Sequence, residues 1–78
     1  MKLKFHGTLA ELRDLLAAYD IHGRWEAKPN GVHMMRHIGG GNVHWANGSK
    51  TLWLDGTFIG KAQLAARVET ALMADPDS

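Results

Sequence analysis

Five histidines are the side chains of this sequence with the widest chemical range. Imidazole nitrogens bind transition metals and exchange protons near neutral pH. If residues 39–42, "GGGN", form a hairpin loop, His37 faces His44 across the strand pair, close enough to share an ion. His33 lies about 13 Å further back along the strand, and no carboxylate is placed to complete a ligand set. We therefore expect no metal site and interpret the histidines as surface groups that titrate near neutral pH.

The segment "LDGTFIGKA", residues 54–62, has the order of strand, glycine loop, lysine and helix from which phosphate-binding loops are built. The spacing from Gly56 to Gly60 is one residue short of that motif, and Ala62 stands where a serine or threonine would hold magnesium. A nucleotide-binding regulator is therefore a minor hypothesis. The expected structure is a glycine-containing turn between a strand and a helix.

Nucleophiles and paired acids are not arranged for catalysis. The serines are Ser49, in a predicted turn, and Ser78, and the sequence has no cysteine. Glu11 and Asp14 have the spacing of any solvated helix face. Because no nucleophile is placed beside a base, we expect no catalytic residues, no enzyme activity and no cofactor.

The composition is that of a small globular protein. The chain has 78 residues, a formal net charge of +1 and 45% hydrophobic residues, which predicts a single domain over residues 1–78 with a thin core. The near-neutral charge argues against a dedicated DNA-binding protein but leaves room for a local basic patch. No apolar run has the length of a signal peptide or membrane span, so we expect a cytoplasmic protein of a bacterial or infected host cell, without a membrane partner.

Apolar periodicity predicts the secondary structure. Strand-like alternation occurs over residues 2–6, 24–28, 32–38, 43–46 and 50–55. Helical spacing follows a capping box of Thr8 and Glu11, to about Asp20, and returns over residues 61–73. The turns are "PNG", "GGGN" and a tight Asn-Gly turn in "NGS". This order, β-α-β-β-β-β-α, predicts an α+β two-layer sandwich: a mainly antiparallel five-stranded sheet with both helices on one face.

The alternation also predicts which side chains form the core. Val43, Trp45, Leu52 and Leu54 should face the helices. Residues 32–38 are ambiguous, because apolar side chains occur on both of their faces. We favour burial of the face that carries Val32, Met34, Arg36 and Ile38 over the face that carries His33, Met35 and His37.

The sheet face opposite the helices is expected to be basic and to carry a tryptophan. An exposed tryptophan among cations is typical of partner-binding surfaces. The residues that we expect to bind a partner are Lys2, Lys4, Arg24, Glu26, Lys28, His44, Trp53 and Asp55. The same interpretation places His6, His33 and His37 on this face.

Two resemblances bear on function. Residues 41–64, "GNVHWANGSKTLWLDGTFIGKAQL", resemble part of the TBP-like N-terminal domain of ribonuclease HIII, which grips nucleic-acid duplexes. That family has a Gly-Lys turn and a strand ending in Gln-Gly, where this chain has Ser49-Lys50 and Asp55-Gly56. In size, charge and absence of a catalytic set, the chain is also similar to small phage-encoded anti-CRISPR proteins, which mostly occupy a surface of a Cas complex.

The leading hypothesis is a small non-enzymatic inhibitor that blocks a surface of a bacterial CRISPR effector complex. The alternative is a small nucleic-acid-binding domain that uses the basic, aromatic sheet face directly. These hypotheses differ in the expected salt dependence of oligonucleotide binding, which is strong only for the second. We expect a monomer rather than a homodimer.

Overall fold

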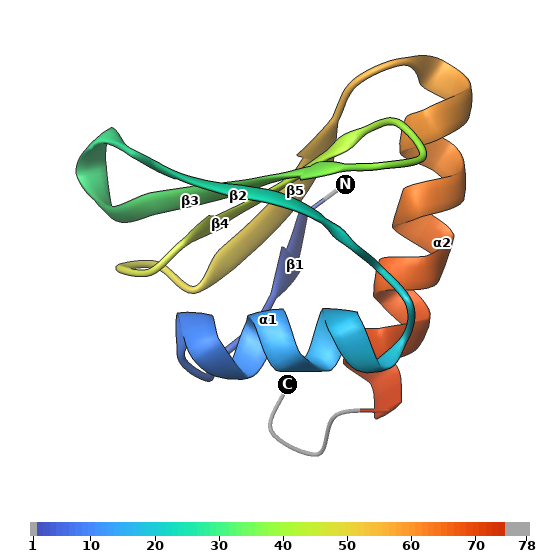
Figure 1. Ribbon diagram of the computed structural model, residues 1–78. Coiled ribbons are helices and arrows are strands. Elements are labelled where there is room, and N and C mark those ends of the chain that lie inside the picture. Colours follow the sequence, from blue (N-terminus) through green and yellow to red (C-terminus); the bar gives the residue numbers. More distant parts are fainter. Residues whose placement is uncertain (1, 75–78) are drawn as a thin grey trace.

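The computed structural model describes residues 2–74, apart from the side chains of Lys2 and Phe58. It is an α+β fold in which a five-stranded antiparallel sheet carries two helices, as the sequence predicts (Figure 1). In chain order the elements are β1 (Lys2–Lys4), α1 (Leu9–Ala18), β2 (Gly23–Lys28), the short 3₁₀ turn η1 (Pro29–Gly31), β3 (Val32–His37), β4 (Asn42–Ala46), β5 (Thr51–Asp55) and α2 (Phe58–Ala74).

The strands lie in the order β1-β5-β4-β3-β2, and each neighbouring pair is antiparallel. Strands β2 to β5 therefore form a meander of hairpins. Strand β1 joins this meander at β5, so the first and last strands of the chain are neighbours. The two edges of the sheet are β1 and β2.

The core lies between one face of the sheet and the two helices. Trp45 at its centre is fully buried, its indole Nε1 donates a hydrogen bond to the carbonyl of Phe5 at 3.1 Å, and the two rings meet edge to face. The predicted core residues of β4 and β5 are all buried. They pack with helix side chains that include Leu12, Leu16, Leu64, Val68 and Leu72.

Local signals in the sequence explain both helix starts. The Thr8 hydroxyl accepts from the amide of Glu11, and the Glu11 carboxylate accepts from the amide of Thr8, which is the predicted capping box. Helix α2 begins at Phe58 rather than at Lys61, because the Thr57 hydroxyl caps it by accepting from the amide of Gly60.

The predicted facing of β3 is wrong. Met35 is fully buried and pairs with Val43, so His33, Met35 and His37 are on the helix side, and Val32, Met34 and Arg36 are on the opposite side. The hairpin closes with a hydrogen bond from the amide of His37 to the carbonyl of Gly41. A hairpin loop over residues 39–42 would pair Ile38 with Val43, but in the structure Met35 pairs with Val43. The two registers differ by an odd number of residues, and an odd shift exchanges the two faces of a strand.

The predicted tight Asn-Gly turn is also wrong. Residues 47–50 lie between β4 and β5, and the left-handed residue among them is Lys50, with φ 60°, rather than Gly48. The Lys50 ammonium donates to the carbonyl of Gly7 and to the side-chain oxygen of Asn47, and it lies 5.1 Å from the centre of the Trp45 ring. These contacts stabilise a backbone conformation that a lysine rarely adopts.

Candidate binding surface on the open sheet face

The sheet face that points away from the helices is here called the open face. Strand alternation and register give its residues, of which Glu26, Met34, His44 and Trp53 form the central cross-strand row. On one side of that row lie Arg24, Arg36, Asn42 and Asp55, and on the other Lys28, Val32, Ala46, Thr51 and Lys4.

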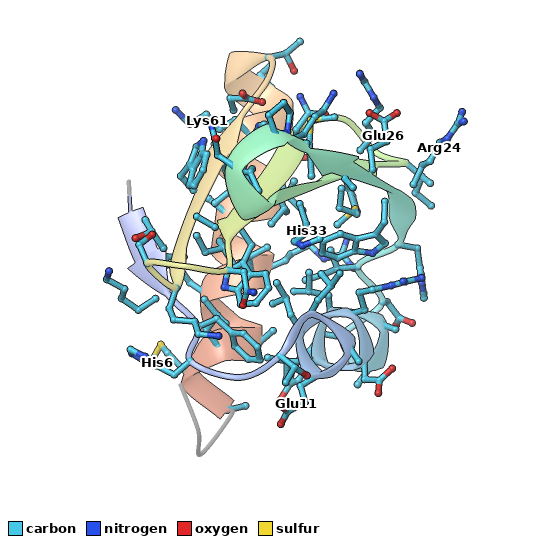
Figure 2. All side chains as sticks on the ribbon, turned by 90° about the vertical axis from the view of Figure 1, so that its left-hand side faces the viewer. His6, Glu11, Arg24, Glu26, His33 and Lys61 are labelled. Atoms are coloured by element: carbon cyan, nitrogen blue, oxygen red, sulfur yellow. The ribbon has the colours of Figure 1, made fainter. Side chains whose placement is uncertain are left out.

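The open face holds the side chains expected to bind a partner. The described ones are Lys4, Arg24, Glu26, Lys28, His44, Trp53 and Asp55, which come from four of the strands. Lys2 pairs with Trp53 in the register, and its side chain is outside the described part of the structure. In Figure 2, Arg24 and Glu26 project outwards from β2, whereas His33 lies towards α1.

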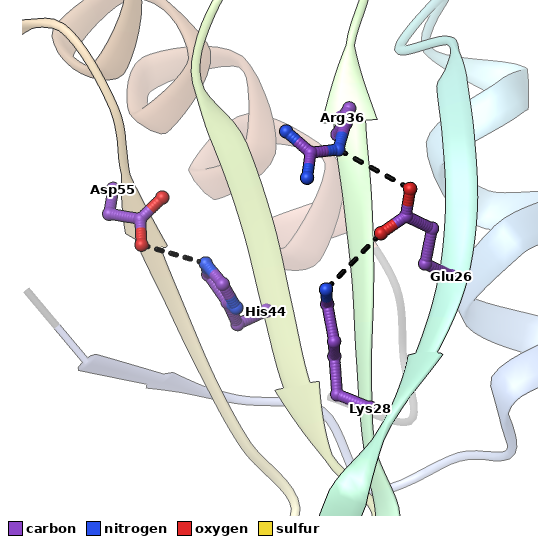
Figure 3. Close-up of polar contacts among 5 residues, drawn as sticks. All are labelled: Glu26, Lys28, Arg36, His44 and Asp55. Carbon is purple, nitrogen blue, oxygen red and sulfur yellow. Dashed lines mark hydrogen bonds and ion pairs between the residues drawn. The ribbon is translucent and has the colours of Figure 1, made fainter.

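An aromatic pair lies at the β4–β5 side of this face. His44 and Trp53 are directly opposite each other, with ring centroids 5.2 Å apart and ring planes only 4° from parallel. His44 Nε2 is 2.9 Å from Asp55 Oδ2 (Figure 3). The side-chain amide nitrogen of Asn42 donates to Asp55 Oδ1 at 2.8 Å. His44 is therefore fixed on two sides, by a ring and by a carboxylate.

The pKa of the Asp55 carboxyl lies below its ordinary value. The hydrogen bond from Asn42 is the largest cause, partial burial opposes it, and the neighbouring His44 and Lys61 lower the pKa further. Asp55 is thus a carboxylate over the whole neutral range, and its charge is directed at His44 and Asn42.

Glu26 forms a second carboxylate centre on the open face. Its Oε1 accepts from Arg36 Nε at 3.4 Å, and its Oε2 is 3.3 Å from the Lys28 ammonium (Figure 3). The hydrogen bond from Lys28 is the largest cause of a lowered pKa of Glu26; burial opposes it, and the charges of Arg36 and Lys28 lower the pKa further. Both carboxylates of the face are therefore held by groups of the same face.

The cations are less constrained. The Lys4 ammonium donates to the Ser49 carbonyl and to the Thr51 hydroxyl, which are neutral acceptors. The exposed Arg24 guanidinium has no hydrogen bond or ion pair with any other described residue. Lys4 and Arg24 lie on opposite edges of the sheet, so positive charge flanks the face on both sides.

Six described residues of the open face were not predicted as partner-binding: Val32, Met34, Arg36, Asn42, Ala46 and Thr51. Arg36 was expected on the buried face, and Asn42 was expected in a loop, so both errors have the same origin in the β3–β4 register. Met34 is only 5% exposed although no helix covers it, because its cross-strand neighbours Glu26 and His44 lie on either side. Alternation from Trp25, which pairs with Met35, would have given the correct facing.

Other histidines lie away from this face. His33 stacks on Trp45 on the helix side, with centroids 6.1 Å apart, and His37 accepts from the amide of Gly39 in the β3–β4 loop. The possible pairing of His37 with His44 is wrong, because the two side chains are on opposite faces of the sheet. Exposed His6 lies two residues after the end of β1 and is outside the sheet register. Within residues 2–74, no group of three metal-ligating side chains is assembled.

The glycines of the "LDGTFIGKA" segment have a packing role. Gly56 has φ 121°, and a Cβ atom there would lie 2.7 Å from the Cα of Gly41. Gly60, in the first turn of α2, lies against the backbone of Gly40 and Gly41. These glycines let the β3–β4 loop contact the junction of β5 and α2 closely, which explains them without a bound phosphate.

No protein-family model, curated protein or solved structure matches this chain. In the described residues, neither helix has the length and apolar character needed to cross a bilayer.

Proposed function

We propose that this protein is a non-enzymatic nucleic-acid-binding module whose open face contacts the phosphate backbone. The observation that carries the proposal is the charge of that face. Its carboxylates, Glu26 and Asp55, are held by neighbouring groups, whereas Lys4 and Arg24 direct positive charge outwards from both edges. A surface of this kind attracts phosphate groups and repels basic proteins.

The aromatic pair supports binding to the backbone rather than to unpaired bases. Proteins that bind single strands stack bases on free aromatic faces. Here His44 and Trp53 cover each other's facing surfaces at 5.2 Å, and no other aromatic ring is present on the described open face. Strands spaced about 4.8 Å apart make the five-stranded face about 19 Å wide, which allows cations on both edges to reach two backbones of a duplex.

The unit on which the ribonuclease HIII resemblance is based is present as β4, the turn at residues 47–50, β5, Gly56 and α2. Its sheet residues Asn42, His44, Trp53 and Asp55 belong to the open face. The resemblance implies contact with a nucleic-acid duplex, which is a reason to examine duplexes first.

The proposal is tested by fluorescence anisotropy with a labelled 20-base-pair duplex and the matching single strand over a series of salt concentrations. Wild-type protein is expected to prefer the duplex, with an affinity that falls steeply with salt. Lys4→Glu and Arg24→Glu should each reduce affinity and reduce the salt slope by about 1. Arg13→Glu makes the same charge change on α1 and should leave binding unchanged. Equal losses in all variants, or no salt-dependent binding, would contradict the proposal.

A second candidate is the inhibitor of a bacterial CRISPR effector complex. The central position of Trp53, half-buried against His44, favours it, because protein interfaces often depend on one large aromatic side chain. The outward charge of the open face suits an acidic or nucleic-acid-bearing surface of such a complex rather than an empty DNA channel, which is basic.

Trp53→Ala separates the two candidates. An effector-binding protein should lose binding to the purified complex with this change alone, and an electrostatic duplex binder should lose little affinity for the oligonucleotide. Loss of binding to the purified complex would weaken the nucleic-acid proposal. Little change in affinity for the oligonucleotide would support it.

A further inference from the structure

Strand β2 is a free sheet edge with unusual regularity. It is six residues long, and its register with β3 runs without a bulge from Gly23 to Lys28. The amide of Ile38 donates to the carbonyl of His22, so in this ladder the even-numbered residues of β2 bond to β3. The N–H and C=O groups of Gly23, Trp25 and Ala27 therefore point outwards along the edge.

The usual protection of an edge strand is incomplete in β2. Edge strands are commonly very short, bulged, interrupted by proline or covered by another element. Strand β1, at the other edge, has three residues, but β2 has the full length of an interior strand, and Pro29 follows only after its last residue. Ala27 is exposed at this edge, and Trp25 is only partly buried.

We propose that two copies of this protein associate through their β2 strands, which pair antiparallel about a twofold axis at Trp25. In this register, the outward groups of Gly23 bond to those of Ala27 in the second copy, and the two Trp25 residues bond to each other. Arg24 then lies directly opposite Glu26 of the second copy, and this ion pair occurs twice.

Charge selects this register from those that the backbone allows. Hydrogen bonding requires the outward-facing odd residues to pair with each other, and axes at Gly23 or Ala27 would leave only one such pair within the two β2 strands. The axes that form at least two pairs pass through Arg24, Trp25 or Glu26. An axis at Arg24 places two arginines opposite each other, and an axis at Glu26 places two glutamates opposite each other and Arg24 opposite Lys28. Of these three axes, only the one at Trp25 places opposite charges together, and like charges directly opposite destabilise a sheet.

Arg24 is free to make this contact, and Glu26 would add it to the two ion pairs that it already forms. Arg24 has no polar partner among residues 2–74. Glu26 is bound from the β3 side by Arg36 and along the strand by Lys28, which leaves its outer side open. The twofold axis keeps even residues of both copies on one side, so the two open faces become one surface of a ten-stranded sheet. The contact is small, so association should depend on concentration.

Sedimentation velocity of the full chain from about 10 µM to about 1 mM tests the proposal, because contacts of this size are weak. Wild type should shift from monomer to dimer. Arg24→Glu and Glu26→Arg, measured separately, each place like charges in both cross-strand pairs, and each should weaken association by about tenfold or more. An equimolar mixture of the two variants should associate again, because a heterodimer has two opposite-charge pairs.

Two further variants test the edge itself. Ala27→Pro removes an outward N–H that β3 does not use, and it should keep the protein monomeric with its circular dichroism spectrum unchanged. Lys4→Glu changes charge on the far edge and should leave association as in wild type. The proposal is overturned if wild type stays monomeric at every concentration, if the mixture associates no better than its components, or if Lys4→Glu weakens association equally.

Discussion

The indole Nε1 of Trp45 donates a hydrogen bond to the backbone carbonyl of Phe5, which joins β4 to the segment that follows β1. The same indole has Phe5 at its edge and the Lys50 ammonium over its face. Trp45 is therefore the point at which the meander, the N-terminal segment and the β4–β5 loop meet.

Trp45→Ala should destabilise the fold by about 3 to 5 kcal/mol, because it leaves a large cavity and an unsatisfied buried carbonyl. Urea denaturation followed by circular dichroism measures this change. Trp53→Ala is the matched control, and it should cost about 1 kcal/mol, the value of a stacked aromatic pair at a half-exposed site. Similar costs for the two variants would mean that Trp45 does not have the central role described.

Asp55→Asn should make stability less sensitive to acid. Because the folded state lowers the pKa of Asp55, the ionised carboxylate stabilises the fold above its unfolded pKa, and this contribution is lost as pH falls through the folded pKa. The variant keeps the oxygen that accepts from Asn42 but has no charge to titrate. Asp55 is half exposed, so the loss at neutral pH should be at most about 1 kcal/mol.

Melting temperatures measured from neutral to strongly acidic pH check this prediction. The control is Asp14→Asn, at an exposed position of α1 with no hydrogen bond or ion pair to the rest of residues 2–74. It should retain the acid sensitivity of wild type. If Asp55→Asn retains it too, the charge of Asp55 does not stabilise the fold.

Gly56→Ala should destabilise the fold by about 1 to 3 kcal/mol, because the residue has φ 121° and a Cβ atom would meet Gly41 at 2.7 Å. Gly48→Ala is the control, since no atom lies within 4 Å of its Cβ position and its φ is not positive. That change should stay within about 0.5 kcal/mol of wild type. Thermal denaturation distinguishes the two, and equal effects would show that the contact of the two loops is not tight.

The sequence predicted most of the fold because its strongest signals are local. Val43 and Trp45, then Leu52 and Leu54, stand at every second position of their strands, and the structure buries all of them. The capping box at Thr8 depends on two residues a single turn apart, and it is present as expected. Periodicity and helix capping are properties of short segments, so one sequence is sufficient to detect them.

The errors concern features that depend on distant residues. The facing of β3 follows from where its hairpin closes, and two adjacent methionines, Met34 and Met35, make either face apolar enough. The left-handed Lys50 is stabilised by the carbonyl of Gly7, far away in the chain. Most of the open face was nevertheless predicted, because Lys4, Arg24 and Trp53 belong to strands with clear alternation, whereas Arg36 and Asn42 were misplaced with the register.

The pairing of β1 with β5 has a consequence for the order of folding. Leu3 and Leu52 are partners although 49 positions separate them, whereas β2, β3 and β4 each pair with the strand that follows in sequence. Closing so long a loop costs more conformational entropy than closing the short hairpins, so the meander should form first and β1 should dock onto it late. During synthesis on the ribosome, the strand that is made first must therefore wait, unpaired, until the strand that is made last has emerged.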